Sequence, residues 1–118
     1  MRQLMGVVSD RGSRYAVSGG EVTDNAGIED FLKTLKRKKK FARATHNSWA
    51  AVLSEGTSFR ADDGETGASI LILQMLERSA LSNHIVVVTR WYGGKHLGGD
   101  RFRHVQACVR AYLADLPV

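Results

Sequence analysis

The chain has 118 residues, enough for one domain with one hydrophobic core and with little room for a second. Its composition, 43% hydrophobic and 25% charged, is typical of a globular protein and argues against a long disordered segment. The single cysteine excludes an internal disulfide, and the apolar runs are too short to span a bilayer. We therefore expect a cytoplasmic protein that forms one domain over residues 1–118 and has no membrane partner.

The positive charge of the chain is concentrated in one short stretch. Seventeen Lys and Arg residues against twelve Asp and Glu residues give a net charge of +5, which favours anionic partners. This basic stretch either contacts phosphates or is a solvated helix face that keeps the protein soluble. Seven of the seventeen cations belong to it, namely Lys33, Lys36, Arg37, Lys38, Lys39, Lys40 and Arg43.

Hydrophobic periodicity and turn residues predict eight elements in the order β-β-α-β-β-α-β-α. The first helix has an apolar stripe from Ile28 to Leu35, with Asp24 or Asn25 as its cap. The second helix is apolar on most sides, which predicts a position deep in the core. In chain order we expect strands at 4–8 and 13–18, a helix from 25 to about 39, strands at 44–53 and 57–61, a helix over 68–79, a strand at 85–88 and a helix from 100.

The strand at Ile85–Val88 decides the expected architecture. Four consecutive β-branched residues are typical of a central strand that is buried on both faces. Because hairpins coexist with at least one crossover, we predict an α/β (α+β) fold, a two-layer sandwich of a mixed β-sheet with helices on one face. Thr66 and Asp100 are expected to cap the helices that follow them.

A glycine-rich segment, RWYGGKHLGG at residues 90–99, is the sharpest motif. Its glycines let main-chain N–H groups approach an anion, and the N-terminus of the next helix adds partial positive charge. The segment either holds a phosphate or a nucleic-acid backbone, with Trp91 or Tyr92 stacking on a base, or is only a strand-to-helix turn. It lacks the spacing of a Walker A or dinucleotide-binding loop. The candidate residues of this site are Arg90, Trp91, Tyr92, Gly93, Gly94, Lys95, Arg101 and Arg103.

An acidic motif precedes the second predicted helix. Asp62, Asp63 and Glu65 can bind Mg²⁺, supply a general base, pair with Arg90 across the fold, or form a solvated turn. His46 is a second candidate base or ligand contact, unless it is a strand histidine bonded to a carbonyl. We predict no metal site and no cofactor. Lys36, Arg37, Lys39 and Lys40 complete the predicted binding surface.

Three ordered motifs resemble those of the IMPACT family, which includes a bacterial, YigZ-like branch. They are Ala44-Thr45-His46-Asn47, Asp62-Asp63-Gly64-Glu65 and Val88–Gly94, and the resemblance spans about residues 13–113. It implies a fold similar to the second domain of ribosomal protein S5. The eukaryotic branch implies a regulator of translation under stress that binds the activator of the kinase acting on initiation factor two, and actin binding is also associated with it. The bacterial branch implies a nucleic-acid-binding or ribosome-linked role.

The resemblance also shapes the expected domain organisation and function. Eukaryotic members usually carry an N-terminal RWD domain and bacterial members an extra C-terminal domain, and we expect this chain to have neither. We predict a non-enzymatic module that binds a translation-control protein, the ribosome or RNA, in an oligomeric state that the sequence leaves open. The alternative is an enzyme acting on a phosphorylated small molecule, with His46, Asp62, Asp63, Glu65 and Arg90 lining one pocket.

Overall fold

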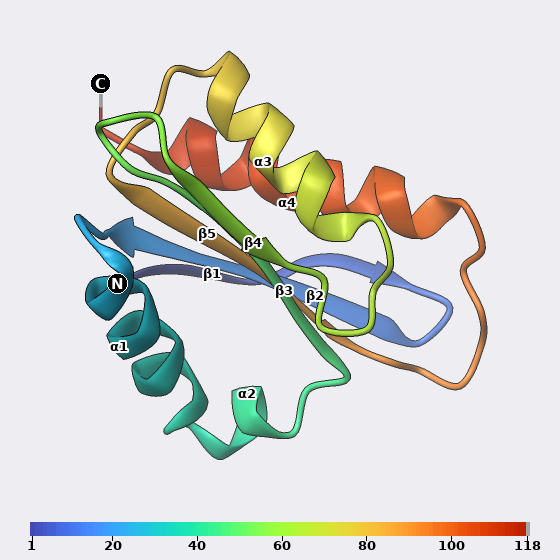
Figure 1. Cartoon of the computed structure of the whole chain (residues 1–118). Coiled ribbons are helices and arrows are strands. Elements are labelled where there is room, and N and C mark those ends of the chain that lie inside the picture. Colours follow the sequence, from blue (N-terminus) through green and yellow to red (C-terminus); the bar gives the residue numbers. More distant parts are fainter. Residues whose placement is uncertain (118) are drawn as a thin grey trace.

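The computed structural model describes residues 1–117, which form one five-stranded sheet and four helices (Figure 1). The elements are β1 (Arg2–Asp10), β2 (Ser13–Glu21), α1 (Asn25–Lys36), α2 (Lys39–Ala42), β3 (His46–Val52), β4 (Ser58–Ala61), α3 (Ala68–Arg78), β5 (His84–Trp91) and α4 (Asp100–Asp115). The strand order in the sheet is β1-β2-β5-β3-β4. None of the helices in residues 1–117 has both the length and the apolar character needed to cross a bilayer.

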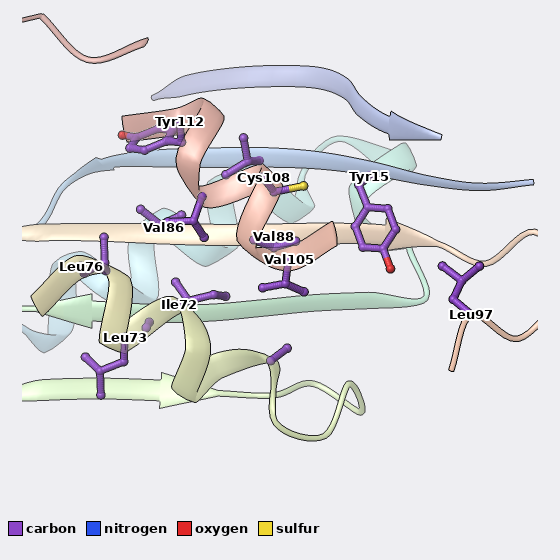
Figure 2. Close-up of a cluster of buried hydrophobic side chains, with 14 residues drawn as sticks. Tyr15, Ile72, Leu73, Leu76, Val86, Val88, Leu97, Val105, Cys108 and Tyr112 are labelled. Carbon is purple, nitrogen blue, oxygen red and sulfur yellow. The ribbon is translucent and has the colours of Figure 1, made fainter. Parts of the chain in front are cut away.

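Each face of the sheet carries its own hydrophobic core beneath a pair of helices (Figure 1). Successive strand residues point to opposite faces, so Val86 and Val88 of β5 face α3 and α4, whereas Ile85 and Val87 face α1 and α2. All four are at most 2% exposed, which confirms the predicted central strand. Figure 2 shows the first core, in which Ile72, Leu76, Val105 and Cys108 pack over Val86 and Val88.

The predicted α+β sandwich of sheet and helices is confirmed, and the structure departs from the prediction in its details. Every strand pair is antiparallel, because the α1–α2 crossover joins β2 to β3 and β5 lies between those two strands. The helices α1 and α2 cover the face opposite α3 and α4, where Ile28 and Leu35 enter the second core. The helix α3 is not buried all round, since Ile70 is exposed.

The first helix is shorter than its periodicity predicts. It was expected to run to about Lys39 but ends at Lys36, and Lys38 is extended with φ −77° and ψ 119° before α2 begins. At about 100° per residue, an uninterrupted helix would direct Phe41 roughly 120° away from Leu35. The break turns Phe41 into the second core, where it is 2% exposed.

The helix caps are also partly different from those expected. Asp24 caps α1 as predicted, since its carboxylate accepts a main-chain N–H of the first turn at 2.7 Å. Thr66 is not a cap, because α3 begins after Gly67, which has a φ of +89°. Asp100 is not a cap either, because it is the first residue of α4 and Gly99 takes the cap position.

Substitution of Gly93 should destabilise the fold through a steric overlap. A Cβ added at Gly93 would overlap the main-chain carbonyl of Gly12, so Gly93→Ala is expected to cost on the order of 1–3 kcal/mol of unfolding free energy. Urea denaturation measures this loss. Gly99→Ala is the control, because its φ is −67° and no atom lies within 4 Å of the added carbon. Equal losses in the two variants would contradict the close approach of the two loops.

Candidate functional site

Three central strands bring polar side chains together at one end of the sheet. The residue in register with Arg90 of β5 is Tyr15 on the β2 side and His46 on the β3 side. Arg90 lies on the same face of β5 as Val86 and Val88, because alternate residues of a strand share a face. Tyr15, His46 and Arg90 therefore all lie on the sheet face that α3 and α4 cover. The apolar face of the central strand therefore ends in a cationic group.

The buried carboxylate of Glu65 contacts both Arg90 and His46. Arg90 Nη1 donates to the two Glu65 carboxylate oxygens at 3.0 and 3.3 Å, and His46 Nε2 lies 3.0 Å from Oε2. Glu65 is 3% exposed and Arg90 is 6% exposed. The Nδ1 atom of His46 also faces an oxygen, the carbonyl of Asp63 at 2.8 Å, so both ring nitrogens have a partner. The predicted pairing of the acidic motif with Arg90 is confirmed for Glu65.

The other two carboxylates of the acidic motif hold main-chain groups. Asp62 accepts hydrogen bonds from the Ser69 hydroxyl, the Ser69 N–H and the Gly67 N–H. From outside the helix it thus binds main-chain N–H groups at the start of α3 that have no partner within the helix. The Ser69 hydroxyl is the main cause that lowers the pKa of Asp62 below its ordinary value. Asp63 accepts from the Asn47 N–H at 2.7 Å. Within residues 1–117 there is no group of three or more His, Cys, Asp or Glu side chains arranged for a metal ion.

The predicted basic surface lies on the other side of the sheet. We call the exposed cations of α1, α2 and the residues beside them the basic ridge, defined as Lys33, Lys36, Arg37, Lys38, Lys39, Lys40 and Arg43. None of the salt bridges among residues 1–117 involves the ridge. The structure thus divides the predicted binding surface into a buried polar cluster and an exposed cationic surface on opposite faces.

The two aromatic residues of the glycine-rich motif have different surroundings. Trp91 packs edge-to-face on Phe41, donates its indole N–H to the Lys40 carbonyl at 2.9 Å and carries the Lys40 ammonium 5.2 Å above its ring. Tyr92 is 43% exposed, and its N–H is bonded to the Thr45 hydroxyl. Of the two residues considered for stacking, Tyr92 is therefore the more exposed, and Trp91 anchors the basic ridge.

The remaining predicted residues lie around the loop that joins β5 to α4. Gly93 and Gly94 begin this loop, and Lys95 is exposed on it. Arg103 is exposed and pairs with Asp100, whereas the Nε atom of Arg101 is buried. Two participants on β2 were not among the predicted site residues, although the segment from Ser13 to Ala16 resembles the opening strand of the family. They are Ser13, whose hydroxyl accepts from the Gly93 N–H at 3.2 Å, and Tyr15.

These features define a small α+β domain that combines a buried ionic cluster with an exposed cationic surface. The sequence profile described as the Impact N-terminal domain matches residues 11–113. A Caenorhabditis elegans protein named Protein IMPACT homolog is 38% identical over 116 residues, covering 92% of this chain and 45% of that protein. Protein IMPACT of Homo sapiens is 36% identical over 113 residues, covering 92% of this chain and 35% of that protein.

Two solved structures are also similar to this chain. A structure of the two-domain translational regulator Yih1 has a TM-score of 0.56 at 31% identity, covering 95% of this chain and 44% of that one. The crystal structure of a hypothetical protein has a TM-score of 0.84 at 22% identity over 98% of this chain and 58% of that one, which supports the fold. The chain belongs to the Impact N-terminal domain family, as its motifs predicted. It spans less than half the length of the two relatives compared above.

Removal of the Glu65 charge should be strongly destabilising. Glu65→Gln leaves the buried Arg90 guanidinium without its carboxylate, which is expected to cost about 3–5 kcal/mol in urea denaturation. The double variant Glu65→Gln/Arg90→Met removes both charges and should recover part of the loss. Arg103→Gln is the control, since its exposed pair with Asp100 contributes at most about 1 kcal/mol. A Glu65→Gln loss no larger than that of the control would contradict the account.

Asp62 should make stability depend on acid pH. Because the folded state lowers the pKa of Asp62 below 3.8, its stabilising effect is full above about pH 5 and is lost as the pH falls through the folded pKa. Asp62→Asn should cost about 1 kcal/mol at pH 7, as a lost helix cap does, and should flatten the loss of stability below about pH 4. Urea denaturation as a function of pH measures both effects. An acid slope in Asp62→Asn that equals the slope of the wild type would refute the assignment.

Proposed function

We propose that this chain is a non-enzymatic binding module of a cytoplasmic translation regulator and that its basic ridge contacts the phosphates of RNA, including ribosomal RNA. The family membership and the similarity to the translational regulator Yih1 support the regulatory role. The observation that carries the RNA contact is the density of exposed cations without salt bridges within the described part of the chain. A role in regulation under stress belongs to the same proposal.

The local structure of the ridge suits a phosphate contact. The break at Lys38 places the end of α1 and the short helix α2 side by side, so their lysines and arginines project from two helices. The Trp91 indole bonded to the Lys40 carbonyl and the buried Phe41 ring hold α2 against the sheet. A partner therefore meets cations on an anchored surface, which reduces the conformational entropy lost on binding.

The proposal predicts salt-dependent RNA binding that depends on the ridge. Arg37→Gln/Lys39→Gln should weaken binding to labelled single-stranded RNA and to purified ribosomes, and should reduce the slope of log K against log salt by about 1.5. Fluorescence anisotropy and ribosome co-sedimentation measure these changes. The matched control Arg78→Gln/Arg110→Gln removes two exposed cations of α3 and α4 and should bind like the wild type.

Two results would overturn the RNA contact. One is equal weakening in the ridge variant and its control. The other is a partner, captured from cytosol, that resists both RNase and salt. Such a partner would be a protein, and the translation-control proteins and actin that the family resemblance implies are then the candidates.

A second candidate function is an enzyme that acts on a phosphorylated small molecule. The observation that favours it is the gathering of His46, Glu65 and Arg90, with Asp62 and Asp63 in the adjoining turn. It ranks below the binding module because both aspartates already accept main-chain N–H groups and Glu65 already contacts Arg90 and His46. Phosphate release from a panel of phosphate esters by the purified chain would favour the enzyme.

A further inference from the structure

Three buried polar atoms of the α3–α4 face have no hydrogen-bond partner within residues 1–117. They are the Tyr15 hydroxyl, Arg90 Nε and Arg101 Nε, which come from β2, β5 and α4. Tyr15 is 1% exposed and Arg90 is 6% exposed. Buried hydrogen-bond donors are nearly always paired in folded proteins. Three buried donors without partners therefore indicate that a bound molecule supplies the missing acceptors.

The three atoms belong to one place in the fold. Tyr15 and Arg90 are in register on neighbouring strands, and the Arg90 Cζ atom lies 5.8 Å from the centroid of the Tyr15 ring. Burial raises the pKa of the Tyr15 hydroxyl. The ring of His104, three residues after Arg101 in α4, lies 5.5 Å from the Tyr15 ring, so the start of α4 adjoins Tyr15. In Figure 2 the Tyr15 hydroxyl points away from β2 and towards Leu97 of the 93–99 loop.

The acidic side chains near this place already have partners. Glu65 is shared between Arg90 and His46. Arg11 and Arg103 bind Asp100, Arg11 and His104 bind Asp10, and both Asp62 and Asp63 accept main-chain N–H groups. Arg101 takes part in none of the salt bridges of residues 1–117, and the first turn of α4 has no side-chain cap. An anion is the group that this set of donors and charges favours.

The geometry also limits the kind of anion. Because the Tyr15 hydroxyl is enclosed, only a terminal group reaches it, and a phosphodiester with a sugar on either side does not. At the surface, Tyr92 is 43% exposed, with its ring centroid 5.8 Å from Arg90 Cζ and 5.7 Å from the His96 ring. These rings offer a contact for a planar group attached to the anion.

We propose that Tyr15, Arg90 and Arg101 bind the terminal phosphate of a small phosphorylated molecule, and that Tyr92 and His96 contact its planar ring. Glycines on both sides of the buried Leu97 let the 93–99 loop move aside for the ligand to enter. This site lies on the sheet face opposite the basic ridge, so it is independent of RNA binding.

The experiment uses inorganic phosphate and AMP as ligands, with adenosine and chloride at equal ionic strength as controls. We expect phosphate and AMP to raise the Tm of the full chain, and AMP to bind more tightly than phosphate in calorimetry. Tyr15→Phe and Arg101→Gln should each weaken AMP binding about tenfold, whereas the ridge variant Arg37→Gln/Lys39→Gln should bind AMP normally. Absence of any stabilisation beyond that of chloride would overturn the proposal.

A second buried tyrosine supplies the matched control. The Tyr112 hydroxyl lies 2.6 Å from His84 Nε2, so Tyr112→Phe should lower the Tm of the free protein and leave AMP binding unchanged. Tyr15→Phe removes a hydroxyl without a partner, so the free protein should be at least as stable as the wild type. A Tyr15→Phe variant that is less stable yet binds AMP normally would contradict the site. So would RNA that competes with AMP and loses its binding in Arg101→Gln.

Discussion

The ion pair between Arg90 and Glu65 is the constraint on which the rest of the structure depends. The central strand carries apolar side chains on both faces from Ile85 to Val88, and Arg90 then buries a charge near the end of the strand. Such a charge is tolerated only with a partner, and the turn before α3 supplies it. The pair therefore sets the position of that turn, from which Asp62 satisfies the start of α3. The pair contributes by fixing one position for that turn, since a buried ion pair adds little net stability compared with apolar packing.

Strand alternation explains how one short motif serves two surfaces. Arg90 and Trp91 are neighbours in sequence but point to opposite faces of β5, one into the ionic cluster and the other onto α2. The same alternation separates the two proposed activities. In this proposal the basic ridge on α1 and α2 binds RNA, and the small ligand binds beneath the loop that leads into α4. A change on one face can then leave binding on the other intact.

Much of the fold could be predicted from the sequence, because its signals are local. The β-branched run at 85–88 identified the central strand, and the opposite charges of Glu65 and Arg90 suggested their pairing. The features that escaped prediction depend on contacts between distant segments. The helix break at Lys38 accompanies the burial of Phe41, and the covering of both sheet faces depends on how the connections cross the sheet, which no local pattern encodes. Tyr15 was predicted only as part of a strand, since its register with Arg90 is what brings it to the site.

We propose that two opposite faces of this domain bind two different partners. An amide NMR spectrum of the isotope-labelled chain, recorded during separate titrations with RNA and with AMP, tests this. RNA should shift the amides of α1 and α2, whereas AMP should shift those of Tyr15, the 93–99 loop and the first turn of α4. Shifts from both ligands on the same face, or AMP shifts confined to the ridge, would contradict it.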